Sequence, residues 1–147
     1  MNIVVLSGFF NPLHGGHLDM IEDGSSMGDK LIVIVNNDTQ QQMKKGKIIL
    51  DGKNRLRLVS ALRDVDDAIL SIDQDATVVE TLRIIAKEHP NDSIIFGNGG
   101  DDRSNAGEVP ETAVCNEMGI KMVYGVGGRN KHDSSTRINR ATGHEVA

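Results

Sequence analysis

Residues 3–17 constrain the fold of this chain more than any other stretch. They begin with an apolar run, residues 3–6, that is bounded by Gly8, which is the pattern of a short buried strand. A loop with Gly and Pro follows, and His14 and His17 then flank a Gly-Gly pair where a helical pattern begins. The chain therefore passes from a strand end through a glycine-containing turn into the start of a helix.

The start of this helix has the properties of a phosphate-binding site. Backbone N–H groups in a first helical turn have no partner within the helix, and the helix dipole favours negative charge there. Gly15 and Gly16 have no Cβ, so a ligand could approach the backbone closely. The imidazoles of His14 and His17 add donors that can stabilise developing charge. A His-x-x-His pattern alone is weak, because most such histidines are ordinary surface residues.

The composition is that of a single globular domain. The chain has 147 residues, of which 38% are hydrophobic and 25% charged, and these values allow a sizeable core. Its net charge of −5 argues against general nucleic-acid binding, and no apolar run approaches the roughly 20 residues of a membrane span. Cys115 is the single cysteine, which fits a reducing cytoplasm. We expect a cytoplasmic protein with one domain over residues 1–139 and a flexible tail over residues 140–147.

The rest of the chain alternates between strand and helix patterns. Strands are predicted at 3–6, 30–36, 65–72, 93–96 and 121–126, and helices follow His17, Asp51, Thr77 and Pro110. This alternation favours an α/β fold with a Rossmann-like, parallel five-stranded sheet and helices on both faces. In such a sheet the loops that leave the carboxyl ends of the strands meet at one edge. The loops predicted to meet there are 8–17, 38–47, 97–101 and 127–137.

Two of these loops resemble the signatures of the nucleotidyltransferase superfamily, which includes cytidylyltransferases and small adenylyltransferases. The first is His-x-Gly-His at residues 14–17, and the second is Ser-Ser-Thr-Arg-Ile at residues 134–138. The resemblance covers nearly the whole chain. It implies transfer of a nucleoside monophosphate from a nucleoside triphosphate, with CTP favoured and ATP second, to a small phosphorylated acceptor. The acceptor phosphate would attack directly and release pyrophosphate, so that catalysis consists of positioning and charge stabilisation.

The resemblance also implies roles for the residues in and beside these signatures. The residues implied in catalysis are His14, His17, Lys44, Lys47 and Arg137, with Lys45 as the alternative to Lys47. Those implied in nucleotide binding are Gly8, Phe9, Phe10, Asn11, Gly16, Gly99, Asp101, Ser134, Ser135 and Thr136. Those implied in acceptor binding are Asp38, Lys44 and Arg55. No protein ligand for a metal is implied; a Mg²⁺ ion would bridge the substrate phosphates.

Several alternatives stay open. By composition alone, residues 40–47 would be a solvated surface loop and Arg55 an exposed helix residue. Asn11 followed by Pro12 resembles nicotinamide-nucleotide adenylyltransferases, whereas residues 36–47 resemble cytidylyltransferases and sugar-phosphate adenylyltransferases.

Three other functions also compete with nucleotidyl transfer. A non-catalytic nucleotide sensor would keep the same loops, and a class I aminoacyl-tRNA synthetase would need further domains. A metal-binding module could use His14, His17 and His132. The sequence does not determine the oligomeric state, for which a homodimer is one possibility.

Overall fold

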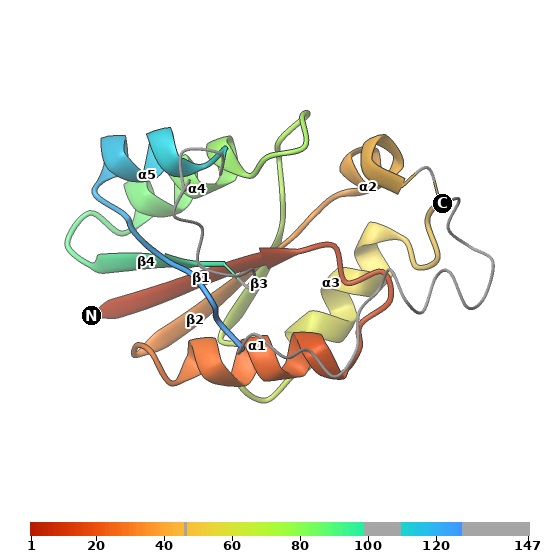
Figure 1. Ribbon diagram of the computed structural model, residues 1–147, viewed down its shortest axis with the longest axis horizontal. Coiled ribbons are helices and arrows are strands. Elements are labelled where there is room, and N and C mark those ends of the chain that lie inside the picture. Colours follow the sequence, from red (N-terminus) through yellow and green to blue (C-terminus); the bar gives the residue numbers. More distant parts are fainter. Residues whose placement is uncertain (46, 99–109, 128–147) are drawn as a thin grey trace.

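The computed structural model describes residues 1–45, 47–98 and 110–127, and Figure 1 shows a central sheet between layers of helices. The strands are β1 (Asn2–Gly8), β2 (Lys30–Val35), β3 (Asp67–Leu70), β4 (Ser93–Gly97) and β5 (Lys121–Val123). The helices are α1 (Gly15–Ser25), α2 (Asp38–Lys45), α3 (Gly52–Ser60), α4 (Val79–Glu88) and α5 (Thr112–Met118). The predicted α/β fold is thereby confirmed.

All five strands form one sheet in the order β3-β2-β1-β4-β5, and every neighbouring pair is parallel. β1 is the central strand: its Val5 lies opposite Ile32 of β2 on one side and Phe96 of β4 on the other. The chain extends the sheet first to one side of β1 and then to the other, so the order reverses between β1 and β4. In open α/β sheets, ligands bind beyond the carboxyl ends of the strands at such a reversal.

Different helices cover the two faces of the sheet. In Figure 1, α4 and α5 lie on one face, and α1 and α3 lie on the other. Successive residues of β1 point to opposite faces, so Val5 packs in the cluster of Leu82 from α4, whereas Leu6 packs in the cluster of Ile21 from α1. Since both faces are covered, residues 3–6 of β1 and 31–35 of β2 are all apolar and buried, without polar alternation.

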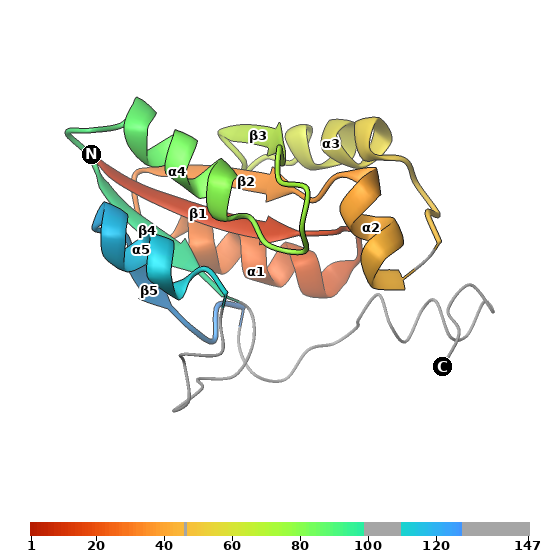
Figure 2. The same cartoon turned by 90° about the horizontal axis from the view of Figure 1, so that it is seen from above.

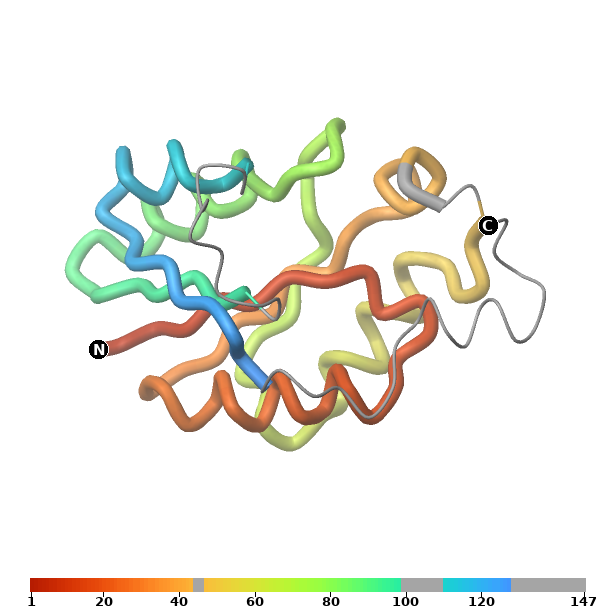
Figure 3. Tube along the Cα trace, viewed as in Figure 1, coloured from red at the N-terminus to blue at the C-terminus, as the bar shows by residue number. Residues whose placement is uncertain are grey.

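The segment with the first signature lies at the carboxyl ends of the strands, together with α2 and the segment before α3 (Figure 3). Figure 3 shows the chain leaving β1 toward the start of α1 at the same end of the molecule as α2 and the segment before α3. Figure 2 places α2 beyond the carboxyl end of β2. Asp51 caps α3 as predicted, because its side chain accepts a hydrogen bond from Asn54 N at 2.9 Å.

The prediction of a loop over residues 38–47 was wrong, because residues 38–45 form helix α2. The buried residues on this helix include Gln40 and Gln41, which are 0% and 2% exposed. A helix that buries amides instead of apolar side chains shows no hydrophobic periodicity, so the sequence pattern resembles a polar loop. Two strands are also shorter than predicted: β3 covers only Asp67–Leu70 and β5 ends at Val123.

Some predictions fall on parts of the chain that the structure does not describe. These are Gly99, Asp101, the second signature at residues 134–138 and the tail at residues 140–147. Of the helices that the structure describes, none is long and apolar enough to cross a membrane.

Candidate active site

The signature loop after β1 is organised around the ring of Phe10. This side chain is 1% exposed, and its backbone has a φ of 53°, which is unusual for a bulky residue. The ring lies over Gly8, where an added Cβ would be 2.9 Å from the Phe10 Cζ. The same ring meets the imidazole of His17 edge-on, with ring centroids 4.7 Å apart and an interplanar angle of 62°. The Phe10 ring therefore positions the His17 imidazole. Gly8 has no Cβ and so leaves room for the Phe10 ring.

His14 and His17 cap the helix that they introduce. His14 Nδ1 accepts a hydrogen bond from Gly16 N at 3.0 Å, and His17 Nδ1 accepts one from His14 N at 3.3 Å. This is a capping box formed by two histidines, and it stacks their rings with centroids 3.9 Å apart. Because both Nδ1 atoms accept, the proton of each neutral imidazole lies on Nε2. Each ring therefore has an Nε2–H as its donor.

This cap changes the expectation that backbone N–H groups at the start of α1 are unpaired and bind phosphate. The N–H of Gly16 donates to the His14 ring, and the N–H of His17 donates to the His14 carbonyl at 3.0 Å. These two backbone donors are already used within the protein. A phosphate could not use these two donors, so the predicted contacts with phosphate depend on the side chains of His14 and His17 and stay predictions. The i, i+3 spacing of the histidines was the sequence signal for this cap.

Arg55 lies beneath the site rather than on its surface. Its side chain is 0% exposed, and its Nε donates to the Leu50 carbonyl at 2.8 Å. Its Nη1 donates to the carbonyls of Phe9 at 2.8 Å and Asn36 at 2.6 Å. Its Nη2 pairs with the Asp38 carboxylate at 2.7 Å. We therefore interpret Arg55 as a residue that holds the surrounding segments of the site together, while its predicted role in acceptor binding stays a prediction.

Helix α2 is anchored by a glutamine that sequence reasoning did not identify. Gln40 accepts hydrogen bonds from Asn36 Nδ2 and Asn37 N, both at 3.0 Å, through its Oε1. Its Nε2 donates to the carbonyls of Asp75 and Thr77, each at 2.7 Å. These contacts tie α2 to the end of β2 and to the segment before α4. The backbone that carries the predicted lysines is thereby fixed at the edge of the sheet.

Asn11 connects the signature loop to the segment that follows α2. It is 3% exposed, and its Oδ1 accepts hydrogen bonds from the N–H groups of Ile49 and Leu50, both at 3.0 Å. Its Nδ2 donates to the Lys47 carbonyl at 3.3 Å. These contacts give Asn11 a role inside the protein, while its predicted contact with the nucleotide stays a prediction. Lys47 itself is exposed next to this connection.

The ends of β4 and β5 approach α1 at the same edge of the sheet. Val126 N donates to the Asn98 carbonyl at 3.0 Å, and Gly127 N donates to the Asp23 carboxylate at 2.8 Å. A Cβ at Gly127 would lie 2.8 Å from Met20 Cα, so the chain passes very close to α1 here. The described part of the chain thus ends at Gly127, in contact with α1.

The structure brings most of the predicted site residues that it describes to one edge of the sheet. The signature loop, Asp38, Lys47 and Arg55 are joined there by the hydrogen bonds given above. Lys44 lies in the last turn of α2, and its side chain falls outside what the structure describes. The functional roles of these residues stay predictions.

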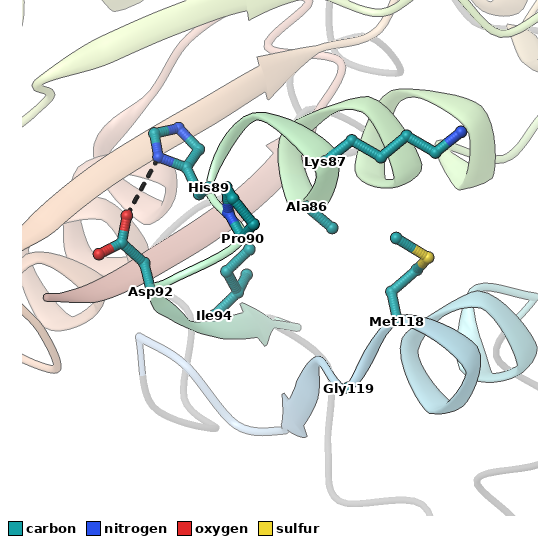
Figure 4. Close-up of a pocket in the computed structure, with 8 residues that line it drawn as sticks. All are labelled: Ala86, Lys87, His89, Pro90, Asp92, Ile94, Met118 and Gly119. Atoms are coloured by element: carbon teal, nitrogen blue, oxygen red, sulfur yellow. Dashed lines mark hydrogen bonds and ion pairs between the residues drawn. The ribbon is translucent and has the colours of Figure 1, made fainter.

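A pocket of about 400 Å³ lies elsewhere, at the amino end of β4 (Figure 4). Its lining includes Ala86 from α4, Ile94 from β4 and Met118 from α5. His89 and Asp92 also line it and lie 3.3 Å apart. The predicted site residues described by the structure do not contribute to this pocket, so it is separate from the signature loop.

Two buried titratable groups lie on and just before α5. Glu111 is 8% exposed, accepts a hydrogen bond from Val78 N at 3.1 Å, and has a pKa raised by burial. Burial, with a smaller contribution from Glu111, raises the pKa of Cys115 to about 11. Cys115 is therefore a protonated thiol at neutral pH and a poor nucleophile. Within residues 1–45, 47–98 and 110–127, no three His, Cys, Asp or Glu side chains are grouped so as to hold a metal ion.

Comparison with known proteins agrees with this architecture. The family described as cytidylyltransferase-like matches residues 5–140 of the chain. The FAD synthase of Thermoplasma acidophilum is 40% identical over 82 residues, which are 54% of this chain and 57% of that protein. The FAD synthase of Archaeoglobus profundus is 42% identical over 72 residues, which are 49% of this chain and 46% of that protein. The chain thus spans about half the length of these two relatives.

Two further matches extend over more of the chain. The FAD synthase of Picrophilus torridus is 34% identical over 117 residues, or 80% of this chain and 77% of that protein. The solved structure of the lipopolysaccharide core biosynthesis protein from Thermoplasma volcanium GSS1 superimposes with a TM-score of 0.65 at 29% identity. This superposition covers 90% of this chain and 99% of that chain. The chain therefore belongs to the cytidylyltransferase-like family of nucleotidyltransferases.

Proposed function

We propose that this protein transfers a nucleoside monophosphate from a nucleoside triphosphate to a small phosphorylated acceptor. An oxygen of the acceptor phosphate attacks the α-phosphorus, the bond from the α-phosphorus to the bridging oxygen breaks, and pyrophosphate leaves. The observation that carries this proposal is the paired capping of His14 and His17, which leaves the donor proton of each neutral ring on Nε2. Two such donors at the reversal of the sheet suit the charge of a triphosphate in its transition state.

The other predicted residues complete the proposed site. Lys44 and Lys47 would neutralise charge on the phosphates, and the second signature at residues 134–138 would hold the β- and γ-phosphates. A Mg²⁺ ion bound with the triphosphate would supply positive charge that offsets the charge of the phosphates, since hard cations prefer oxygen ligands. The proposed donors, the imidazole N–H groups of His14 and His17 and the ammonium groups of Lys44 and Lys47, fit phosphate oxygens rather than the metal itself.

For the donor we propose ATP, with CTP as the alternative. Several relatives are named FAD synthase, and FAD contains an adenylyl group, which favours ATP. The resemblance of residues 36–47 to cytidylyltransferases favours CTP. The acceptor is proposed to be a phosphate monoester, because a local group of cations in a protein of net charge −5 suits a second anion. A cytoplasmic location and a homodimer stay predictions.

A screen of substrates tests this proposal. ATP, CTP, GTP and UTP are each combined with flavin mononucleotide, glycerol 3-phosphate, sugar 1-phosphates, nicotinamide mononucleotide and phosphopantetheine, and pyrophosphate release is measured. Unphosphorylated counterparts of the acceptors serve as controls. We expect release only with a phosphorylated acceptor. Turnover with an alcohol alone would overturn the acceptor assignment, and triphosphate binding without any release would identify a non-catalytic nucleotide sensor.

A further inference from the structure

Lys47 lies in the part of the chain between α2 and the cap of α3. We propose that Asn11 and Gln41 are positioning residues that hold Lys47 beside the signature histidines, so that its ammonium group binds the polyphosphate chain of the substrate. This inference rests on the proposed function. Among the lysines of residues 44–47, it assigns to Lys47 the binding of polyphosphate that depends on the side-chain amides of Asn11 and Gln41.

The carbonyl of Lys47 is the point at which three segments meet. It accepts a hydrogen bond from Asn11 Nδ2 at 3.3 Å and another from Gln41 Nε2 at 3.1 Å. Asn11 belongs to the loop that leaves β1, whereas Gln41 belongs to α2. The backbone at Lys47 is thus fixed to both segments at once, although its side chain is exposed.

Asn11 uses both ends of its amide in this arrangement. Its Oδ1 accepts from Ile49 N and Leu50 N, and its Nδ2 donates to Lys47. A carboxylate at this position could accept the same two hydrogen bonds but has no N–H for the Lys47 carbonyl. The Lys47 carbonyl therefore requires an amide, rather than a carboxylate, at residue 11 as its hydrogen-bond donor.

The burial of Gln41 carries a cost to stability. It is 2% exposed, and its Oε1 has no hydrogen-bond partner within the part of the chain that the structure describes. A buried acceptor without a partner destabilises the folded state, so an apolar side chain of similar length would suit this position better for stability alone. Its Nε2 contact with Lys47 is the interaction that offsets this cost.

Fixing the backbone of Lys47 favours binding of an anion by its side chain. Asn11 lies three residues before His14, and Arg55 holds the neighbouring Phe9 and Leu50 carbonyls. The backbone of Lys47 therefore cannot move independently of the signature loop. A cation on a fixed backbone loses less conformational freedom when it contacts phosphate than one on a mobile loop.

Binding of inorganic tripolyphosphate, measured by isothermal titration calorimetry, tests this inference without requiring turnover. We expect Lys47→Met and Gln41→Met each to weaken binding by about three- to tenfold, and the double variant to be no weaker than Lys47→Met alone. Lys53→Met, at an exposed lysine of α3, is the matched control and should bind like the wild type. Thermal unfolding of Gln41→Met should occur at or above the wild-type temperature, since the buried Oε1 is gone.

Asn11→Asp provides a second route to the same result if Gln41→Met folds poorly. It should weaken tripolyphosphate binding more in the wild-type background than in the Lys47→Met background, where only repulsion by the added carboxylate remains. The inference would be overturned if the double variant lost affinity by the product of the two single-variant factors. It would also be overturned if the wild type did not bind tripolyphosphate. A different result is that the double variant binds no more weakly than Lys47→Met while no combination of triphosphate and acceptor releases pyrophosphate. In that case the proposed function fails, but the positioning role of Asn11 and Gln41 stands.

Discussion

Replacing Arg55 by Met separates its structural role from a direct role in substrate binding. The guanidinium group is fully buried and bonds three backbone carbonyls, those of Phe9, Asn36 and Leu50, in addition to the Asp38 carboxylate. Met has a similar length but no donor. The variant therefore fills the space while leaving these four acceptors without their charged partner.

The size of the effect follows from the burial of each partner. A buried carbonyl left without a donor costs about 1 kcal/mol or more, and three are affected. The Asp38 side chain is 44% exposed, so water can solvate it. The loss of its ion pair adds less than about 1 kcal/mol. We expect Arg55→Met to lower the free energy of unfolding by about 3 to 5 kcal/mol. The midpoint of thermal unfolding should fall by roughly 10 to 20 °C.

Urea unfolding followed by circular dichroism measures this loss directly. Arg57→Met is the matched control, because Arg57 is an exposed arginine on the same helix. The control should change stability by no more than about 0.5 kcal/mol. If Arg55→Met unfolds within about 1 kcal/mol of the wild type and loses only activity, the buried-network reasoning is refuted and Arg55 acts as a substrate ligand.

Three further changes test other parts of the site and fold. His17→Ala should lower kcat about 100-fold in pyrophosphate release assays, and His14→Ala should in addition lose about 1 kcal/mol of stability as a helix cap. Gly8→Ala places a Cβ 2.9 Å from the Phe10 ring and should cost about 1 to 3 kcal/mol in urea unfolding. The stability contributed by Glu111 is present below its ordinary pKa of 4.5 and is lost as the pH rises through the raised pKa. The stability gained by Glu111→Gln in urea titrations should therefore grow as the pH rises above the ordinary pKa of 4.5, and a gain that stays constant with pH would contradict this.

Local patterns in the sequence were enough to predict the framework of the fold. Apolar, β-branched runs predicted the five strands, and their alternation with helices predicted a parallel sheet. The cap of α3 by Asp51 was also predictable, because it depends on residues close together in the chain. The histidine capping box had a visible i, i+3 signal that the phosphate-binding interpretation overlooked.

Helix α2 and the contacts of Arg55 were not predictable in this way. Gln40 is buried because it bonds carbonyls more than 30 residues away, and hydropathy treats such a residue as exposed. Arg55 is likewise buried through partners in separate segments, the most distant of them 46 residues away. No local pattern encodes which backbone groups will accept from a polar side chain.

The sequence alone thus determined where the five strands, the helices other than α2 and the histidine signature would form, since these depend on side chains a few residues apart. Only the tertiary structure decided that Asn11, Gln41 and Arg55 point inward and hold the site together. The physical reason is that a polar side chain can be buried only where distant backbone groups satisfy its hydrogen bonds. Those partners meet only when the parallel sheet brings the ends of its strands to one edge.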